Sequence, residues 1–210
     1  MLIINLNIRG LGGGTKARYL NHIIAREGAE FVCIQETKAL QFSDARCYSL
    51  WGDNKAGWLH YEGDNGSGSL FSMWHRDAFI YESHAMGKGF IVVFGQHIKA
   101  NCRCVVVNIY VACLLREKKV LWWELTRIKL VSQYLIWCFC GDFNVVRSLS
   151  ERKGIRERDI QSSETRDFNC FIDANFLIEF PFVGKKFTWF NSNGSAKSRL
   201  DRVLVTEDWM

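Results

Sequence analysis

Short apolar runs alternate with amphipathic segments along the chain, a pattern typical of an α/β protein. Helices are predicted at residues 16–27 and 118–134, and a third helix is predicted to begin at a Ser162 or Ser163 cap. Strands are predicted at residues 2–8, 31–35, 69–74, 90–98, 103–110, 135–141, 186–190 and 200–205. Several strands follow one another without a helix between them. This favours two mixed sheets with outer helices over a doubly wound parallel sheet, although periodicity alone leaves both open.

The 210 residues contain no linker, repeat or low-complexity tract, so we expect one domain spanning residues 1–210. No apolar run approaches the ~20 residues of a membrane helix, and residues 1–10 lack the pattern of a signal peptide. The eight cysteines have no zinc-site spacing and lie mostly in apolar runs, which favours reduced, buried thiols. We therefore expect a soluble intracellular protein. A net charge of +5 fits a polyanionic partner, but many metabolic enzymes are equally basic.

Polar and acidic residues recur where predicted strands end, which is where ligand sites gather in sheet proteins. They are Asn7, Glu36, Tyr110, Asp142, Asn144 and Asp201. Asp142 and Asn144 are two residues apart, so in an extended chain their side chains point the same way. Carboxylates and a carboxamide at one edge suit Mg²⁺ or Mn²⁺. Each residue taken alone also fits a turn, an exposed strand end, a packing role or a surface ion pair.

The order of the motifs around these residues distinguishes a shared metal site from a set of unrelated structural roles. Asn-Ile-Arg-Gly at 7–10, Gln-Glu-Thr-Lys at 35–38, Asn-Ile-Tyr at 108–110, Gly-Asp-Phe-Asn at 141–144 and Ser-Arg-Leu-Asp-Arg at 198–202 together resemble the signature of the endonuclease/exonuclease/phosphatase superfamily. Gly-Leu-Gly-Gly at 10–13, Ser-Leu-Trp-Gly at 49–52, Ser-Glu-Arg-Lys-Gly at 150–154 and Gly-Lys-Lys-Phe-Thr-Trp at 184–189 resemble plant LINE endonucleases.

That resemblance implies an α/β (mixed α+β) fold, a four-layer sandwich of two mixed β-sheets flanked by helices. It also implies a Mg²⁺- or Mn²⁺-dependent endonuclease that nicks DNA to prime reverse transcription. Such a protein would be a monomer acting in the nucleus, with a reverse transcriptase domain in the intact element.

Individual roles follow from the same resemblance. Asn7 and Glu36 would hold the divalent metal, with Glu36 as the direct carboxylate ligand. Tyr110 would donate a hydrogen bond to the scissile phosphate. Asp142 would position or activate the attacking water, and Asn144 would orient the phosphate and that nucleophile.

Asp201 would hold a general acid/base histidine in orientation. Members of the family end with a Ser-Asp-His segment, whereas this sequence ends in Asp-Trp-Met and none of its five histidines follows an aspartate. We therefore expect Asp201 to lack its histidine and an inner strand edge to be unpaired, with the C-terminal strand missing. Leu6 stands where the family usually has Trp, and Ser69 where it has a second Gly. Residues 111–113 replace a turn that often contains Pro.

Cations near the predicted site loops are candidates for contacts with DNA phosphates. They are Arg9, Lys38, Lys185, Lys186, Lys197, Arg199 and Arg202. Any one of them could instead be a solvated surface charge. Two other functions remain open: a phosphatase of the same superfamily, and a nucleic-acid-binding remnant with impaired catalysis.

Overall fold

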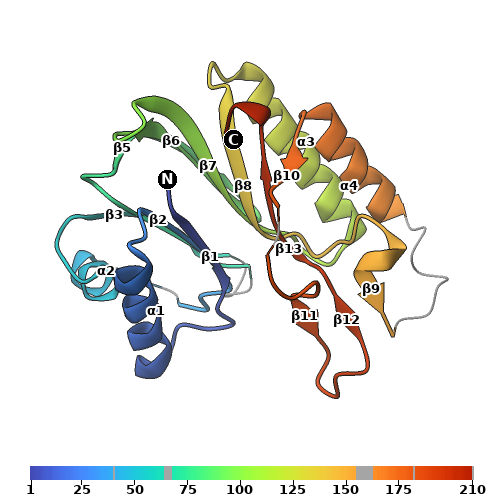
Figure 1. Ribbon diagram of the computed structural model, residues 1–210, viewed down its shortest axis with the longest axis horizontal. Coiled ribbons are helices and arrows are strands. Elements are labelled where there is room, and N and C mark those ends of the chain that lie inside the picture. The colour runs from blue at the N-terminus through green and yellow to red at the C-terminus, as the bar shows by residue number, and fades with distance from the viewer. Residues whose placement is uncertain (40, 64–67, 155–162, 182, 210) are drawn as a thin grey trace.

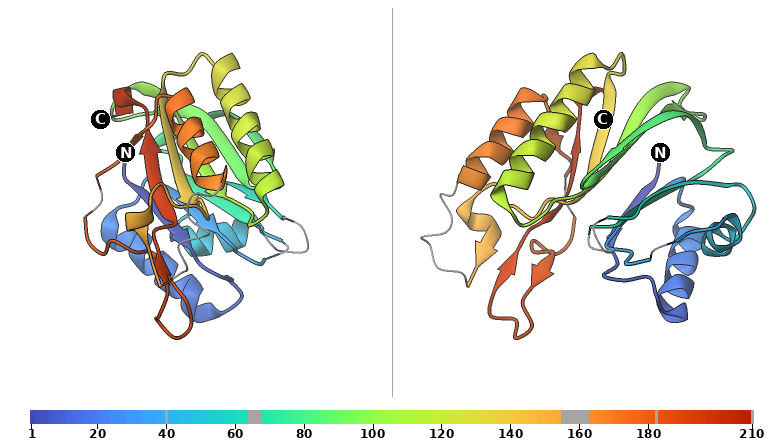
Figure 2. Two further views of the ribbon diagram at one scale, coloured as in Figure 1. Left: turned by 90° about the vertical axis from the view of Figure 1, so that its right-hand side faces the viewer. Right: turned by 180° about the vertical axis from the view of Figure 1, so that it is seen from behind.

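The computed structural model describes residues 1–39, 41–63, 68–154, 163–181 and 183–209. Two mixed sheets face each other, and each is covered on its outer face by a pair of helices (Figures 1 and 2). The predicted sandwich of two mixed sheets with outer helices is therefore confirmed. No helix in the described part of the chain is both long and apolar enough to cross a membrane.

The smaller sheet consists, in spatial order, of β1 (Ile3–Asn7), β2 (Phe31–Gln35), β4 (Leu70–His75) and β3 (Ala56–Tyr61). Its outer helices are α1 (Gly14–Glu27) and α2 (Asp44–Trp51). β1 and β2 are parallel, and the other pairs are antiparallel. Within the described residues β1 pairs with β2 alone, so β1 forms one edge of this sheet and ends at Asn7.

The larger sheet consists, in spatial order, of β10 (Ile178–Glu179), β13 (Asp201–Val205), β8 (Ile136–Asp142), β7 (Cys102–Tyr110), β6 (Phe90–His97) and β5 (Phe79–Gly87). Its outer helices are α3 (Leu115–Val131) and α4 (Ser163–Ala174), which lie side by side (Figure 1). β7 and β8 are parallel. A small third sheet contains β11 (Trp189–Phe190), β12 (Lys197–Ser198) and β9 (Arg152–Lys153), and short 3₁₀ turns cover Leu149–Glu151 and Glu207–Trp209.

The apolar residues form three layers of core. One packs the larger sheet against α3 and α4 and includes Leu121 and Phe139. A second packs the smaller sheet against α1 and α2 around Leu20. The third lies between the two sheets and includes Phe31 and Val106. The central strands are buried on both faces, which explains their nearly continuous apolar sequence.

Some elements lie outside the sequence predictions. Helix α2, strands β3 and β5, and the short strands β9, β10 and β12 were not predicted. Helix α3 begins at Leu115 and ends at Val131, rather than spanning 118–134, and in the 186–190 segment only Trp189–Phe190 pairs as a strand. Helix α4 begins at Ser163, and residue 162 lies outside the described residues. The structure pairs none of the eight cysteines, and five of them are buried; their reduced state stays a prediction.

Candidate active site

Strand register brings three of the predicted site residues into one row. In the larger sheet Asp142 at the end of β8 lies opposite Tyr110 of β7 on one side and Asp201 of β13 on the other. In the smaller sheet Asn7 ends β1, beside Gln35, and Glu36 follows β2 directly. Because β1 and β2 are parallel, their carboxyl ends meet at one edge, which faces the row on the larger sheet.

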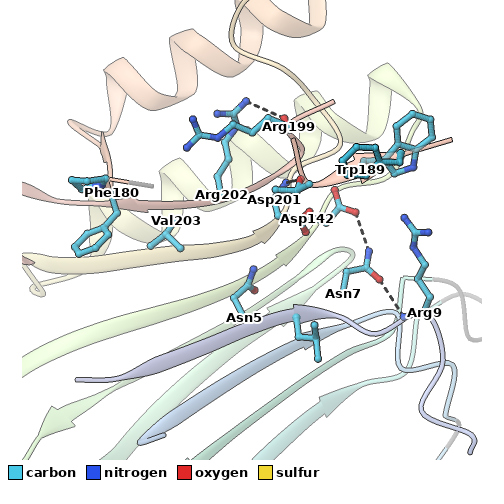
Figure 3. A pocket seen from close by; sticks show the side chains of 14 residues that line it. Asn5, Asn7, Arg9, Asp142, Phe180, Trp189, Arg199, Asp201, Arg202 and Val203 are labelled. Carbon is cyan, nitrogen blue, oxygen red and sulfur yellow. Dashed lines mark hydrogen bonds between the residues drawn. The ribbon is translucent and has the colours of Figure 1, made fainter. Parts of the chain in front are cut away.

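The side chain of Asn7 joins the two sheets. Its Nδ2 donates to Glu36 Oε1 at 2.8 Å and to Asp142 Oδ2 at 3.0 Å, and Figure 3 shows the bond to Asp142. Tyr110 lies near enough to Glu36 for the charge of that carboxylate to raise the Tyr110 pKa. The Asn144 backbone N–H donates to Asp142 Oδ1 at 3.0 Å. The structure thus places Asn7, Glu36, Asp142 and Asn144, from three separate motifs, within one hydrogen-bonded group, with Tyr110 beside it.

The backbone around this group is unusual. Six non-glycine residues in the described ranges have positive φ, and four of them border the site: Arg9 (47°), Glu36 (54°), Lys38 (51°) and Asn144 (46°). Asparagine tolerates this conformation better than the other three do. Left-handed non-glycine residues are held only where their surroundings over-determine them, and they gather at functional sites. The surrounding contacts therefore fix the directions in which these side chains project.

Gly141, the residue before Asp142, has φ of 150°. A Cβ built at this position would lie 1.9 Å from the carbonyl oxygen of Ile109 on β7. Only glycine lets β8 approach β7 closely enough at this point, so Gly141 sets the position of Asp142 at the end of the strand.

Burial, and at Asp142 and Tyr110 also neighbouring carboxylate charges, raises the pKa values of groups in the row. Burial, together with the charges of Asp201 and Glu36, raises the Asp142 pKa to about 6, against hydrogen bonds from Asn144 and Asn7. Burial also raises the pKa of Asp201, although a hydrogen bond with Thr188 opposes the shift. Burial and the charges of Glu36 and Asp142 raise the pKa of Tyr110 to about 12. Tyr110 is therefore a protonated donor at neutral pH, and the gathered carboxylates favour a bound cation.

A cleft of about 680 Å³ opens over this row, between the ends of β1, β8 and β13 and the segment leading into β11. Its polar lining includes Asn7, Asp142 and Asp201, and Arg9 and Arg199 supply positive charge (Figure 3). Its aromatic and further apolar lining includes Phe180, Pro181, Trp189 and Phe190. Cations and aromatic faces beside carboxylates form a surface that suits an anionic substrate carrying flat rings.

Comparison with known proteins identifies the family. A model of the endonuclease/exonuclease/phosphatase family matches residues 4–210. The chain belongs to this family. Enzymes of the family hydrolyse phosphodiester or phosphomonoester bonds and generally use a divalent metal ion. No curated protein sequence matches the chain significantly.

Several solved structures have the fold of this family member. The AP endonuclease LMAP from Leishmania major superposes with a TM-score of 0.77 at 15% identity, covering 98% of this chain and 78% of that one. The 3′ phosphatase NExo from Neisseria, bound to a product DNA hairpin, gives 0.73 at 16% identity, with coverage of 98% and 86%. The endonuclease domain of TRAS1, a telomere-specific non-LTR retrotransposon, gives 0.70 at 14% identity, with coverage of 98% and 84%.

The residues at the row fit the metal that the family uses. Glu36 supplies carboxylate oxygens, the ligands that hard cations prefer, beside the carboxylate of Asp142. Asn7 carries a carboxamide oxygen of the same ligand type, which accepts from the Arg9 backbone N–H at 3.3 Å while Nδ2 faces the two carboxylates. In the described ranges no three His, Cys, Asp or Glu side chains are grouped to hold a metal. Mg²⁺ is usually bound through one or two carboxylates and completes its octahedron with water or substrate oxygens.

The predicted phosphate-binding cations separate into two groups. Arg9, Lys38, Lys185 and Lys186 are exposed. Arg199 lines the cleft, and its Nη2 is paired with Glu179 Oε1 at 2.7 Å. The ammonium group of Lys197 lies 5.0 Å from the centre of the Phe187 ring. Arg9 and Arg199 line the cleft, Lys38 follows the Glu36 segment, and the other three belong to the segment around β11 and β12.

Arg202 differs from the other six. It is 3% exposed, and its guanidinium is ion-paired with Glu151 and, at 2.8 Å, with Glu179. It also lies 5.8 Å above the Phe168 ring of α4. The prediction that Arg202 contacts DNA does not fit this buried position, and its contacts indicate that it holds β13 against the helix layer.

Several residues that shape the site were not recognised in the sequence. The Thr188 hydroxyl accepts hydrogen bonds from the backbone N–H groups of Leu200 and Asp201, both at 3.0 Å. Thr188 therefore fixes the start of β13 and the carboxylate of Asp201. The only signal in the sequence was its place inside the Gly-Lys-Lys-Phe-Thr-Trp motif of this family member.

A chain of buried amides lies directly behind the row. Gln35 Nε2 donates to Asn5 Oδ1 at 2.8 Å and to Asn108 Oδ1 at 2.7 Å, which links β1, β2 and β7. Gln35 precedes Glu36, and Asn5 and Asn108 lie two residues before Asn7 and Tyr110. The signal that could have revealed them is a polar residue inside an otherwise apolar strand.

Proposed function

We propose that the chain is a divalent-metal-dependent endonuclease that nicks DNA, of the kind that LINE retrotransposons use to prime reverse transcription. The observation that carries the proposal is the Asn7 amide, which brings the carboxylates of Glu36 and Asp142 together across two sheets. The motifs shared with plant LINE endonucleases and the fold shared with the TRAS1 endonuclease domain support the finer assignment.

In the proposed mechanism Glu36 and Asn7 would hold the metal, which would offset the charge that develops on the phosphate oxygens. Tyr110, which remains protonated, donates a hydrogen bond to the scissile phosphate. Asp142 takes the proton of the attacking water. Its raised pKa makes it a stronger base than an ordinary aspartate while leaving it ionised at neutral pH. Asn144 orients the phosphate and the attacking water.

Asp201 is assigned an orienting role. It lies beside Asp142 in the strand register, and the hydroxyl of Thr188 holds its carboxylate. From this position it can fix the orientation of an acid/base group that enters the cleft opposite Asn7.

DNA is the proposed partner, bound through its phosphates by Arg9, Lys38, Lys185 and Lys186, together with Lys197 and Arg199. Phosphate contacts position the duplex but do not read its sequence, so weak sequence preference is expected. We propose that the protein acts as a monomer in the nucleus, with a reverse transcriptase domain in the intact element.

A phosphatase acting on nucleic-acid ends is the second candidate, because a 3′ phosphatase shares the fold over 98% of this chain. The same row of residues could serve either reaction, since both stabilise charge on a phosphate. The third possibility, a nucleic-acid-binding remnant, predicts DNA binding without hydrolysis.

Nicking of a supercoiled plasmid tests the proposal. We expect Mg²⁺ or Mn²⁺ to support conversion to open circles and EDTA to stop it. Glu36→Gln should abolish this conversion because it retains the shape of the side chain but loses the charge that a hard cation requires. Glu27→Gln, an exposed carboxylate on α1, is the matched control and should leave nicking unchanged.

Each alternative has its own outcome in the same set of assays. Release of phosphate from a 3′-phosphorylated oligonucleotide without plasmid nicking would favour the phosphatase. DNA binding with neither product would favour the remnant. Full metal-dependent nicking by Glu36→Gln would show that the metal is held elsewhere.

A further inference from the structure

Lys118 is a buried cation that the proposed mechanism does not use. It lies in the first turns of α3, is 3% exposed, and faces α4 and the loop after β8. Lysine is rarely buried to this extent, because removing its ammonium group from water is costly unless partners replace the water. Its partners therefore indicate what the burial achieves.

The ammonium group has one partner on each side. Nζ donates to Glu164 Oε2 on α4 at 2.9 Å and to the backbone oxygen of Asn144 at 2.8 Å. A hydrogen bond from a charged donor is stronger than one between neutral groups. Lys118 therefore links a residue of the helix layer, Glu164, to a residue of the site loop, Asn144.

Asn144 is the residue that most needs such a contact. Its φ is 46°, its backbone N–H donates to Asp142 Oδ1, and one N–H of its side-chain amide donates to the Val111 oxygen at 2.8 Å. Its carbonyl oxygen faces the helix layer, where Lys118 meets it. A donor at this oxygen stabilises the left-handed conformation of Asn144. That conformation directs the Asn144 backbone N–H at the carboxylate of Asp142.

The neighbouring residue on α3 provides an internal comparison. Lys119 forms the adjacent ion pair with α4, to Asp167 at 3.5 Å, but its side chain is 55% exposed and reaches no site residue. An exposed pair of this kind suffices to link two helices. The burial of Lys118 is explained by its second contact, with Asn144.

We propose that Lys118 is a positioning residue for the hydrolytic reaction. By binding the Asn144 carbonyl from behind, it fixes the turn that orients Asn144 and Asp142 in the cleft. This inference deepens the proposed function and rests on it.

The test compares three variants of the whole chain: Lys118→Met, Lys119→Met and Glu164→Gln. Single-turnover plasmid nicking gives the maximal rate and the half-saturating protein concentration, and thermal unfolding gives stability. We expect Lys118→Met to lower the maximal rate by on the order of 10²-fold, the effect of a misplaced site group, with little change in half-saturation. Lys119→Met should leave both values unchanged.

Glu164→Gln separates positioning from stability. It removes the carboxylate partner but leaves Lys118 in place to donate to Asn144. We expect it to lower the unfolding temperature about as much as Lys118→Met does while retaining most of the nicking rate. If the rates of the two variants instead fall in proportion to their stabilities, Lys118 has only a structural role and the inference is overturned.

Hydrogen exchange at the Asn144 amide provides a readout that requires no activity. We expect faster exchange in Lys118→Met and unchanged exchange in Lys119→Met, relative to the unmodified chain. If the unmodified chain does not nick with any divalent metal, the proposed function fails, and exchange alone decides the positioning role. If the chain nicks but Lys118→Met changes neither rate nor exchange, the positioning inference fails and the proposed function stands.

Discussion

Replacing Asn108 by leucine should interrupt the chain of hydrogen-bonded amides that joins Asn5, Gln35 and Asn108 behind the site. Asn108 has no exposed surface; its Oδ1 accepts from Gln35, and its Nδ2 donates to the Phe71 oxygen at 3.0 Å, to Ser72 Oγ at 3.2 Å and to the Ile34 oxygen at 3.3 Å. Leucine has the same branching and number of side-chain heavy atoms as asparagine, so the change mainly removes hydrogen bonds. The Ile34 and Phe71 carbonyls remain within the pairing of β2 and β4. The groups that lose a partner are therefore the amide of Gln35 and the hydroxyl of Ser72.

The expected cost follows from these two groups. A buried polar group that loses its partner costs about 1–3 kcal/mol. Gln35 retains its hydrogen bond to Asn5, so the lower half of the range applies to it. We expect Asn108→Leu to lower the free energy of unfolding by about 2–5 kcal/mol, measured by urea unfolding followed through tryptophan fluorescence.

A double-mutant cycle with Gln35→Leu tests the reasoning. Gln35 Oε1 is buried without a hydrogen-bond partner in the described structure, so the second change also removes an unsatisfied atom. Replacing both partners by apolar groups of similar shape can be nearly neutral. The double variant should therefore lose much less stability than the sum of the single variants. A sum that is simply additive, or an Asn108→Leu cost below about 1 kcal/mol, would refute the assignment of a coupled network.

Three further predictions concern other parts of the molecule. Burial raises the pKa of Glu151, but the hydrogen bond and charge of Arg202 outweigh burial, so the folded pKa lies below the unfolded value. The ion pair therefore stabilises the fold above the unfolded pKa, and this stabilisation is lost as the pH falls through the folded pKa. Glu151→Gln should thus lower the free energy of unfolding by about 3–5 kcal/mol at neutral pH and by progressively less as the pH is lowered, measured by urea unfolding from neutral to acid pH. A difference that does not change with pH would contradict the ion pair with Arg202. Affinity for duplex DNA, followed by fluorescence anisotropy, should fall steeply with salt, and Lys185→Ala with Lys186→Ala should reduce the slope by about 2. An unchanged slope would place these lysines off the DNA. Gly141→Ala should abolish nicking and lower the unfolding temperature, because its Cβ would collide with a carbonyl oxygen of β7; an active, stable variant would show that the strand can shift.

The sequence predicts the inner part of the fold well and its periphery poorly. Strands β2, β7 and β8 are buried on both faces, so their apolar runs were placed to within a residue or two. Strand β5 is exposed along most of its length, and its pattern offers neither an apolar run nor alternation. Helix α2 has only eight residues, too few for a clear helical period.

For the site, motif order identified the residues but not the contacts between them. The hydrogen bond from Asn7 to Asp142 joins positions 135 residues apart, and no local pattern encodes it. Arg202 illustrates a signal that was present but not used. Leu204, two residues on, is buried against the helices, so the alternation along β13 directs the Arg202 guanidinium toward the helix layer, although the residue also lines the cleft.

At the residues with left-handed backbone around the site, fold stability and catalytic activity favour different amino acids. At Arg9, Glu36 and Lys38, glycine would adopt the same backbone conformation more readily and would relieve local strain. Selection for a more stable fold alone would therefore favour loss of two cations and the proposed metal ligand from the rim of the cleft. Copies of such a gene that are released from selection for nicking can become more stable while they lose their chemistry, so a robust fold in a relative is no evidence that its site still works.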